Sequence, residues 1–311
     1  MNPAFSVIFL TTLIGVGQGL FVALFAAELA GFGGAQATER ALLAAGGAVA
    51  LGFTALGLLA SVFHLERPAR AWRAAAMWRT SWLSREVIAL PLFLGLLAAW
   101  SAAQRWLPPA TPLLGALALL ACAALFVCTG MVYASIRFLQ EWASGYTLLN
   151  FALLGLASGC VLATALAALA VPGRVRAFGL AALALTAAGG VSRTLSLRRN
   201  ARLKPKSTLA TAIGIRHPQI AQRSMGFMGG SFNTREFFHG RAPGVLRRLK
   251  WVFLLAAFVL PLALLAAGLA AGSAALLLLA FALQFAGLLV ERWFFLAQAN
   301  HPQNLYYLVV S

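Results

Sequence analysis

Residues 41–104 of the chain read ALLAAGGAVALGFTALGLLASVF (41–63), HLERPARAWRAAAMWRTSWLSR (64–85) and EVIALPLFLGLLAAWSAAQ (86–104). Two apolar runs therefore flank a loop that is rich in arginine and tryptophan. A helix of about 20 apolar residues is long enough to cross the hydrocarbon core of a bilayer. This stretch predicts two membrane-spanning helices joined by a charged loop at the membrane surface.

The same pattern extends over all 311 residues. Hydrophobic residues make up 61% of the chain, charged residues make up 10%, and the mean hydropathy is +0.86, which excludes an ordinary soluble domain. Eight apolar segments are long enough to span a bilayer, at about 5–30, 41–63, 86–104, 112–136, 147–171, 177–195, 251–271 and 274–297. Backbone groups in lipid need partners within their own segment, so these segments should be helices. We predict an all-α polytopic membrane protein with one integral-membrane domain, residues 1–311.

The distribution of basic residues predicts the orientation. The first apolar run is too long for a signal-peptide core, so we expect it to be retained, and eight spans place both termini on the same side. Of the 24 Lys and Arg residues, 20 fall on that side and four, Arg40, Arg105, Arg174 and Arg176, fall on the other. By the positive-inside rule, both termini and the second, fourth and sixth loops are cytoplasmic. Topology and attraction to anionic membrane lipid explain part of the net charge of +17, and we predict no nucleic-acid partner.

The sixth loop, residues 198–250, is longer and more basic than topology requires. It mixes glycine, aromatic and charged residues, without the bias of a low-complexity tail. Long loops of this kind are functional or disordered. We favour a docking surface for a soluble partner over a flexible tether. The candidate docking residues are Arg67, Arg73, Arg198, Arg199, Arg202, Lys204, Lys206 and Arg235.

The spans lack the ligands that most redox cofactors need. None of the four histidines, His64, His217, His239 and His301, lies in the middle of a span, which argues against a haem with two axial histidines. The three cysteines have no paired spacing for zinc or an iron–sulfur cluster. The chain has no aspartate, so no Ser-His-Asp triad is possible. We expect no haem, no iron–sulfur cluster, no metal and no catalytic residues in this chain.

A few polar residues remain within or beside the spans. Gln18, Asn150 and Gln284 lie inside apolar segments, and we expect each to form a hydrogen bond between helices. His64 ends the second span and Glu86 begins the third, so both should lie at the same membrane interface. Imidazole titrates near neutral pH, and a partly buried carboxyl can approach that range, so the pair could transfer a proton. Alternatively, His64 and Glu86 only complement the dipoles of the two helix ends.

The segment HLERPARAW (64–72), followed by SREV (84–87), resembles the His-Leu-x-x-Pro-x-Arg-Ala and Ser-x-Glu signature of one family. That family is the membrane-anchor subunits of dimethyl sulfoxide reductase-type molybdoenzymes. The eight spans and the pair Glu291-Arg292 in the last span are also similar, so the resemblance covers most of the chain. It implies a haem-free anchor in the bacterial inner membrane that holds a four-cluster-type iron–sulfur subunit and a molybdopterin catalytic subunit. It also implies electron exchange with a quinone, either ubiquinone or menaquinone.

The resemblance assigns roles to the charged loop. It implies that His64 and Glu86 line the quinone site and transfer protons, with Arg70 as a neighbour. Trp72, Trp78 and Trp82 could line the entrance, or could form only an interfacial aromatic belt. Gln18 is a further candidate for the pocket wall.

The direction of electron flow and the class of protein leave alternatives. The sequence KSTLATAIGIRHPQ (206–219) followed by GFMGGSFNTREFFHG (226–240) resembles the branch that oxidises sulfite in the cytoplasm. We therefore expect electrons to pass from sulfite to quinone. The alternatives are a quinol-oxidising anchor of an S-oxide, N-oxide or polysulfide reductase, a structural anchor without a quinone site, and a secondary transporter. The two halves of the chain show no repeat, and no charge lies at the midplane, which argues against a transporter.

Overall fold

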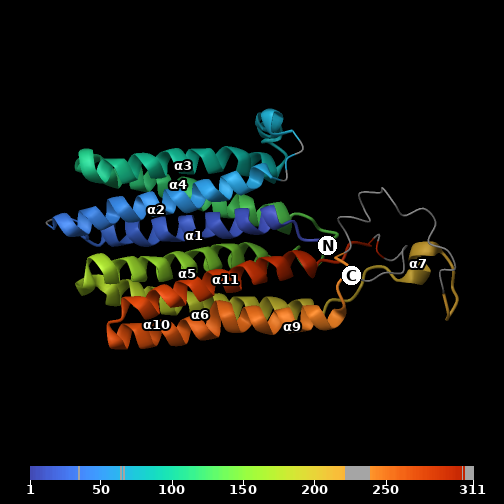
Figure 1. Ribbon diagram of the computed structural model, residues 1–311. Helices are drawn as coiled ribbons and strands as arrows, with labels where there is room; N and C mark the ends of the chain where they lie inside the picture. Colours follow the sequence, from blue (N-terminus) through green and yellow to red (C-terminus); the bar gives the residue numbers. More distant parts are fainter. Residues whose placement is uncertain (34–35, 64, 66, 221–238, 303, 305–311) are drawn as a thin grey trace.

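The computed structural model describes all residues except 34–35, 64, 66, 221–238, 303 and 305–311 (Figure 1). It contains eight helices that are long and apolar enough to cross a membrane, which confirms the predicted fold class. The described residues form no strand. The first six spans are α1 (Phe5–Leu29), α2 (Ala37–Val62), α3 (Trp82–Trp106), α4 (Thr111–Ala134), α5 (Gly145–Ala170) and α6 (Val175–Asn200). The seventh span runs through α9 (Pro243–Leu254), η4 (Leu255–Val259) and α10 (Leu260–Ala271), and the eighth is α11 (Ala274–Ala297).

Several helices extend further than hydropathy predicts. Helix α3 begins at Trp82 rather than at residue 86, because the Ser81 side chain accepts a hydrogen bond from the Ser84 amide and caps the first turn. Helix α6 continues to Asn200 rather than 195, and α9 begins at Pro243 rather than 251. The connection between α6 and α9 is therefore shorter than the predicted loop 198–250. It contains the short helix α7 (Leu209–Ile213).

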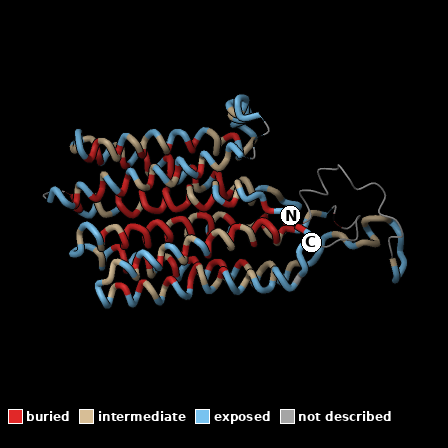
Figure 2. The backbone as a smooth tube through the Cα atoms, in the orientation of Figure 1, coloured by how far each residue is buried: buried red, intermediate tan, exposed pale blue. Residues whose placement is uncertain are grey.

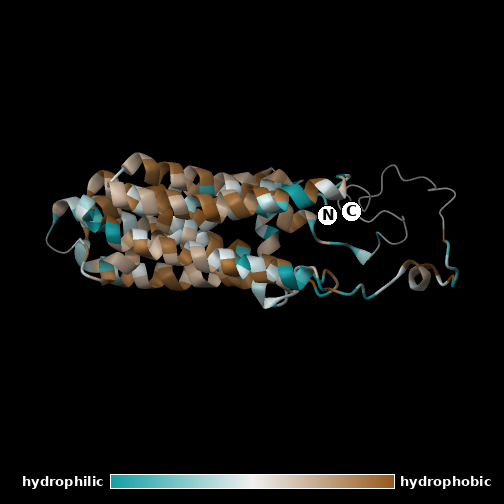
Figure 3. Ribbon diagram, turned by 90° about the horizontal axis from the view of Figure 1, so that it is seen from below, coloured by the Kyte–Doolittle hydropathy of each residue, from teal (hydrophilic) through white to brown (hydrophobic). Residues whose placement is uncertain are grey.

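The helices form two neighbouring groups (Figure 1). Helices α1 to α4 form one, and α5, α6 and α9 to α11 form the other. Helix α1 begins and α11 ends at the same end of the bundle, which we call the basic end because α6 finishes there with Arg198 and Arg199. The loop between α2 and α3, which contains the 3-10 helix η1 (Pro68–Met77), lies at the same end. Apolar residues fill the middle of the bundle, and hydrophilic residues gather at its ends (Figure 3).

Helices α1 and α5 lie at the centre of the bundle. In the most apolar 18-residue stretch of each span, 61% of the residues are buried for α1 and 67% for α5 (Figure 2). For the other spans this share is 33–44%. The two helices cross with their backbones in contact. A Cβ atom on Gly19 would overlap the Gly155 carbonyl, and a Cβ atom on Gly159 would overlap the backbone of Gly19 and Leu20. Small residues at such crossings allow close packing of membrane helices.

Two polar contacts join helices in the second group, as expected from the sequence. Ser192 Oγ donates to Asn150 Oδ1 at 2.8 Å and joins α6 to α5. Gln284 Nε2 donates to Thr186 Oγ1 at 3.2 Å and to the Ala257 carbonyl at 3.3 Å. Ala257 belongs to η4, a π-helical turn. Wider turns of this kind leave carbonyls available to side chains from neighbouring helices.

The backbone contact between α1 and α5 gives a stability prediction. Gly159→Ala should destabilise the folded protein by about 1–3 kcal/mol, because the added methyl group forces two helix backbones apart. The matched control is Gly52→Ala in α2, where a Cβ atom would have no neighbour within 4 Å. The thermal unfolding temperature in detergent should fall for the first variant and stay unchanged or rise for the second. Equal temperatures would contradict the contact.

Candidate functional site

Glu86 lies in the second turn of α3, half-buried near the basic end. The start of the helix at Ser81 sets its position, because every later residue follows the helical register. Thr129 on α4 is buried, and its Oγ1 donates a hydrogen bond of 2.6 Å to Glu86 Oε1. One carboxyl oxygen is thus held against α4. The described residues provide no hydrogen bond to the other oxygen.

Glu86 faces a small cavity of about 10 Å³ at the junction of four helices. The lining residues are Thr11, Ile14, Gly15 and Gln18 of α1, Glu86 of α3, Phe126 and Thr129 of α4, and Phe151 of α5. This volume is about what one water molecule occupies. A six-membered ring with its substituents does not fit inside it. A larger ligand can reach the carboxyl only from the exposed side of α3 or by displacing these side chains.

The structure brings Gln18 and Glu86 together, although they are far apart in the sequence. Both line the same cavity. Gln18 is 2% exposed, and its Nε2 donates to the Cys122 carbonyl of α4 at 3.0 Å. The predicted hydrogen bond between helices is confirmed, and the amide is held beside the carboxyl.

The other residues predicted for this site lie differently. His64 lies outside the described residues. Arg70 is exposed on η1, and Trp72 and Trp78 are 71% and 52% exposed. None of these three lines the cavity that contains Glu86.

Trp82 and Arg85 organise the start of α3. The guanidinium carbon of Arg85 lies 4.2 Å from the centre of the Trp82 ring. Arg85 also donates hydrogen bonds of 2.8 Å to the carbonyls of Trp78 and Arg79. These contacts tie the loop to the helix that carries Glu86, so this arginine has a structural role.

A buried cluster of charges lies in the second helix group. Arg193 of α6 and Glu291 and Arg292 of α11 are 1%, 1% and 5% exposed. Arg193 Nε lies 2.6 Å from Glu291 Oε1, and Arg292 Nη1 lies 3.5 Å from Glu291 Oε2. From the sequence, Arg193 is counted with the sixth loop and Arg292 lies at the inner end of the last span. The structure instead places Arg193 within α6, and both arginines are buried in the bundle. The sequence did contain a signal for this cluster. Arg193 lies at the end of one apolar segment, and the pair Glu291-Arg292 lies in another.

Aromatic rings connect this charge cluster to the cavity. The guanidinium carbon of Arg292 lies 3.8 Å from the centre of the Phe151 ring, and Phe151 also lines the cavity. Tyr133 stacks on Phe151 with ring centres 5.4 Å apart. Cation–π contacts of this kind are strongest when they are shielded from water. Phe151 is therefore shared between the cavity and the ion cluster.

The candidate docking residues mostly lie on the surface of the basic end. Arg67, Arg73, Arg198, Arg202, Lys204 and Lys206 are exposed, and Arg235 lies outside the described residues. Arg199 differs, because its guanidinium donates to the carbonyls of Gln140 at 3.0 Å and Ala143 at 3.4 Å. It holds the connection between α4 and α5 and is not free for a partner.

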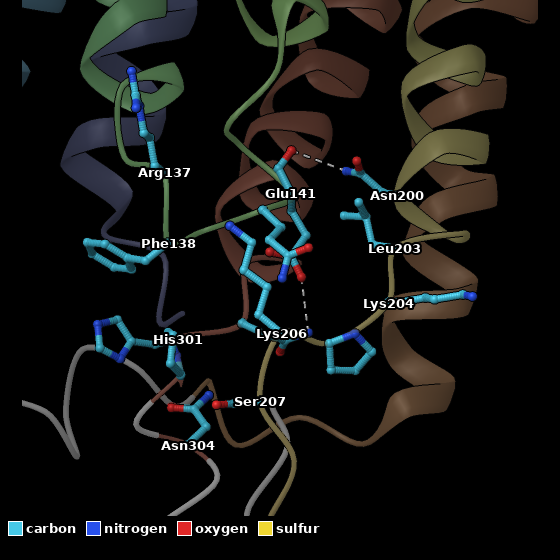
Figure 4. Close-up of a pocket in the computed structure, with 14 residues that line it drawn as sticks. Arg137, Phe138, Glu141, Asn200, Leu203, Lys204, Lys206, Ser207, His301 and Asn304 are labelled. Carbon is cyan, nitrogen blue, oxygen red and sulfur yellow. Dashed lines mark hydrogen bonds between the residues drawn. The ribbon is translucent and has the colours of Figure 1, made fainter. Parts of the chain in front are cut away.

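A pocket of about 610 Å³ with several charged lining residues opens beside these residues (Figure 4). It is lined by Lys204 and Lys206 of the segment after α6 and by Arg137 of the connection between α4 and α5. Burial holds the pKa of the His301 imidazole below its ordinary value, so this ring is neutral at pH 7. The positive charge of the pocket therefore comes from Arg and Lys side chains.

The fold and the site define a multi-pass membrane protein with a half-buried carboxyl near its basic end. The profile of the family described as "DMSO reductase anchor subunit (DmsC)" matches residues 1–307. A sulfite dehydrogenase subunit from Allochromatium vinosum is 52% identical over 327 aligned residues, which cover the whole of both chains. The chain belongs to the DMSO reductase anchor subunit family.

The charge cluster gives a second stability prediction. Arg193→Met should destabilise the protein by about 3–5 kcal/mol, because it leaves Glu291 buried with a weaker partner. Arg176→Met on the same helix is the control, since Arg176 is exposed at the opposite end. Thermal unfolding in detergent measures both. An unchanged unfolding temperature for Arg193→Met would show that the ion pair does not stabilise the bundle.

Proposed function

We propose that this chain is the haem-free membrane anchor of a molybdopterin and iron–sulfur oxidoreductase and that it passes electrons between the iron–sulfur subunit and quinone. Membership of the anchor family supports the first part of the proposal. The second rests on one observation. Thr129 holds one oxygen of Glu86 beside a small cavity near the basic end and leaves the other oxygen for a ligand.

The chemistry around Glu86 suits a quinone head group. A carboxyl can donate a proton to a carbonyl oxygen or accept one from a hydroxyl. The cavity is too small for the quinone ring. We therefore propose that the head group binds on the exposed side of Glu86. His64 would be the second polar residue that contacts it. His64 enters on the family resemblance alone. Gln18 supports the wall behind the carboxyl, and Thr129 fixes its orientation.

Quinone, when bound, supplies a carrier that takes up two electrons and two protons. The residues of this chain would manage the protons. Glu86 would give its proton to the head group and recover another from the basic end, where the α2–α3 loop lies. The electrons would come from the clusters of a partner docked on Arg202, Lys204 and Lys206.

We propose that electrons flow from sulfite to quinone. The support is the similarity over the full length to a protein named as part of a sulfite dehydrogenase. The second candidate is the opposite direction, in which Glu86 accepts protons from a quinol and the partner reduces an S-oxide or N-oxide. The name of the family favours that candidate. Both place the complex on the cytoplasmic face of the bacterial inner membrane, which follows from the positive-inside rule.

Glu86→Gln tests the quinone site. In the complete complex, this variant and His64→Ala should lower sulfite:quinone turnover about 100-fold, because a proton-transferring group is lost. Sulfite oxidation with an artificial acceptor that takes electrons directly from the soluble subunits should stay unchanged. Glu141→Gln, a carboxyl at the same end but outside the cavity, should retain quinone turnover. Normal quinone turnover in Glu86→Gln would mean that the site is wrongly assigned.

The purified complex tests the direction of electron flow. With sulfite and oxidised quinone, we expect reduced quinone to form. With quinol and dimethyl sulfoxide as the added substrates, we expect no oxidation of the quinol. Metal analysis should find molybdenum and iron in the associated subunits. The reverse pattern of activity would establish the quinol-oxidising alternative.

A further inference from the structure

A long groove separates α6 from α9, η4 and α10, in the helix group that does not contain Glu86. Its volume is about 1,090 Å³, and Phe294 of α11 and Gln298, the residue that follows this helix, also line it. The wall on α6 consists of residues spaced three or four apart, including Ala187, Gly190 and Thr194, which therefore share one face. Small residues line this face, and Phe258 of η4 packs close to Gly190, where an added Cβ atom would lie 3.3 Å from its ring.

The groove has the length of one lipid leaflet. It extends along α6 from Thr186, in the middle of the span, to Arg198 at the basic end. Twelve residues of helix correspond to about 18 Å. Half of the hydrocarbon core of a bilayer is about 15 Å thick. An acyl chain that enters at the basic end would therefore lie along the whole groove.

The walls and the mouth of the groove differ in chemistry. In the hydrocarbon region the lining is mostly apolar and includes Val191 of α6 and Leu255 and Phe258 of η4. At the mouth, Arg198 and Lys250 bring positive charge from two different helices. Glu141 also lines the mouth, and its carboxylate accepts a hydrogen bond of 3.4 Å from Asn300. Two cations against one carboxylate leave the mouth positive.

A further feature of the mouth suits a lipid head group. Trp251 is 59% exposed beside Lys250, in the position of an interfacial aromatic anchor.

We propose that this groove binds one anionic glycerophospholipid from the leaflet at the basic end. Its phosphate lies between Arg198 and Lys250, and one acyl chain follows α6 towards Thr186. Basic sites between membrane helices bind anionic head groups by this chemistry. A quinone is the competing occupant, but its head group carries no charge to match the two cations. The proposal concerns a site separate from Glu86 and does not depend on quinone turnover.

Lipid retention tests the proposal. The full-length chain, purified with its partners in mild detergent, is exchanged into nanodiscs of phosphatidylcholine with a minor fraction of phosphatidylglycerol of identical chains. Bound lipids and quinone are then extracted and quantified per protein. Phosphatidylglycerol should be retained in preference. Arg198→Ala with Lys250→Ala should lower its retention about 25-fold, because each cation contributes about fivefold.

Two matched controls separate a site from diffuse attraction. Arg247→Ala with Arg248→Ala removes two exposed cations of α9 outside the groove and should change retention by no more than about twofold, because such charges are screened. Ala187→Phe blocks the groove and should abolish preferential retention. Ala188→Phe places the same ring on an exposed neighbour outside the groove and should not.

Three results would overturn the proposal. The first is equal retention of the two phospholipids. The second is equal loss in the test and control variants. The third is loss of quinone instead of phosphatidylglycerol in Ala187→Phe, which would identify the groove as a quinone site. Glu86→Gln should leave lipid retention unchanged. Failure of the proposed quinone site can therefore be distinguished from failure of the lipid site. Thermal unfolding of each variant confirms that it is folded.

Discussion

The rest of the structure depends on the direct backbone contact between α1 and α5. In lipid there is little hydrophobic gain from bringing two helices together, so close van der Waals packing and polar contacts must hold them. Glycines at 19, 155 and 159 allow the two central helices to approach until their backbones touch. That approach sets where Gln18 points and places Phe151 against the same cavity. The candidate site is therefore a product of helix packing as much as of its polar residues.

Charge is distributed in two ways at the basic end. Most basic side chains remain at the surface, where water and lipid head groups solvate them. Arg193 and Arg292 instead lie inside the bundle, where burying an ion is costly and requires a close partner. Glu291 and the rings of Phe151, Phe253 and Phe294 provide that compensation. The cluster fixes α6 and α11 relative to each other near the surface on which a partner would dock.

Much of this architecture could be predicted from the sequence. The eight spans follow from hydropathy, because no soluble fold tolerates such long apolar segments. The ends of the helices could not be predicted from hydropathy. Local contacts outside the apolar segments, such as the Ser81 cap, determine where each helix begins or ends. The proximity of Gln18 and Glu86 and the pairing of Arg193 with Glu291 depend on which helices pack together. The role of Arg199 could not be predicted for the same reason. Its hydrogen-bond acceptors are carbonyls of the loop between α4 and α5, and only the folded structure places that loop next to Arg199.

The shared position of Phe151 determines how the central cavity can change shape. Arg292 lies over this ring, and Tyr133 stacks on it, so the ring cannot turn without exposing a guanidinium to an apolar interior. This wall of the cavity is therefore rigid. Expansion around Glu86 therefore involves the first helix group, whose members α1, α3 and α4 supply the other lining residues. Motion in the first helix group is thus separated from the ion cluster that holds the second group together.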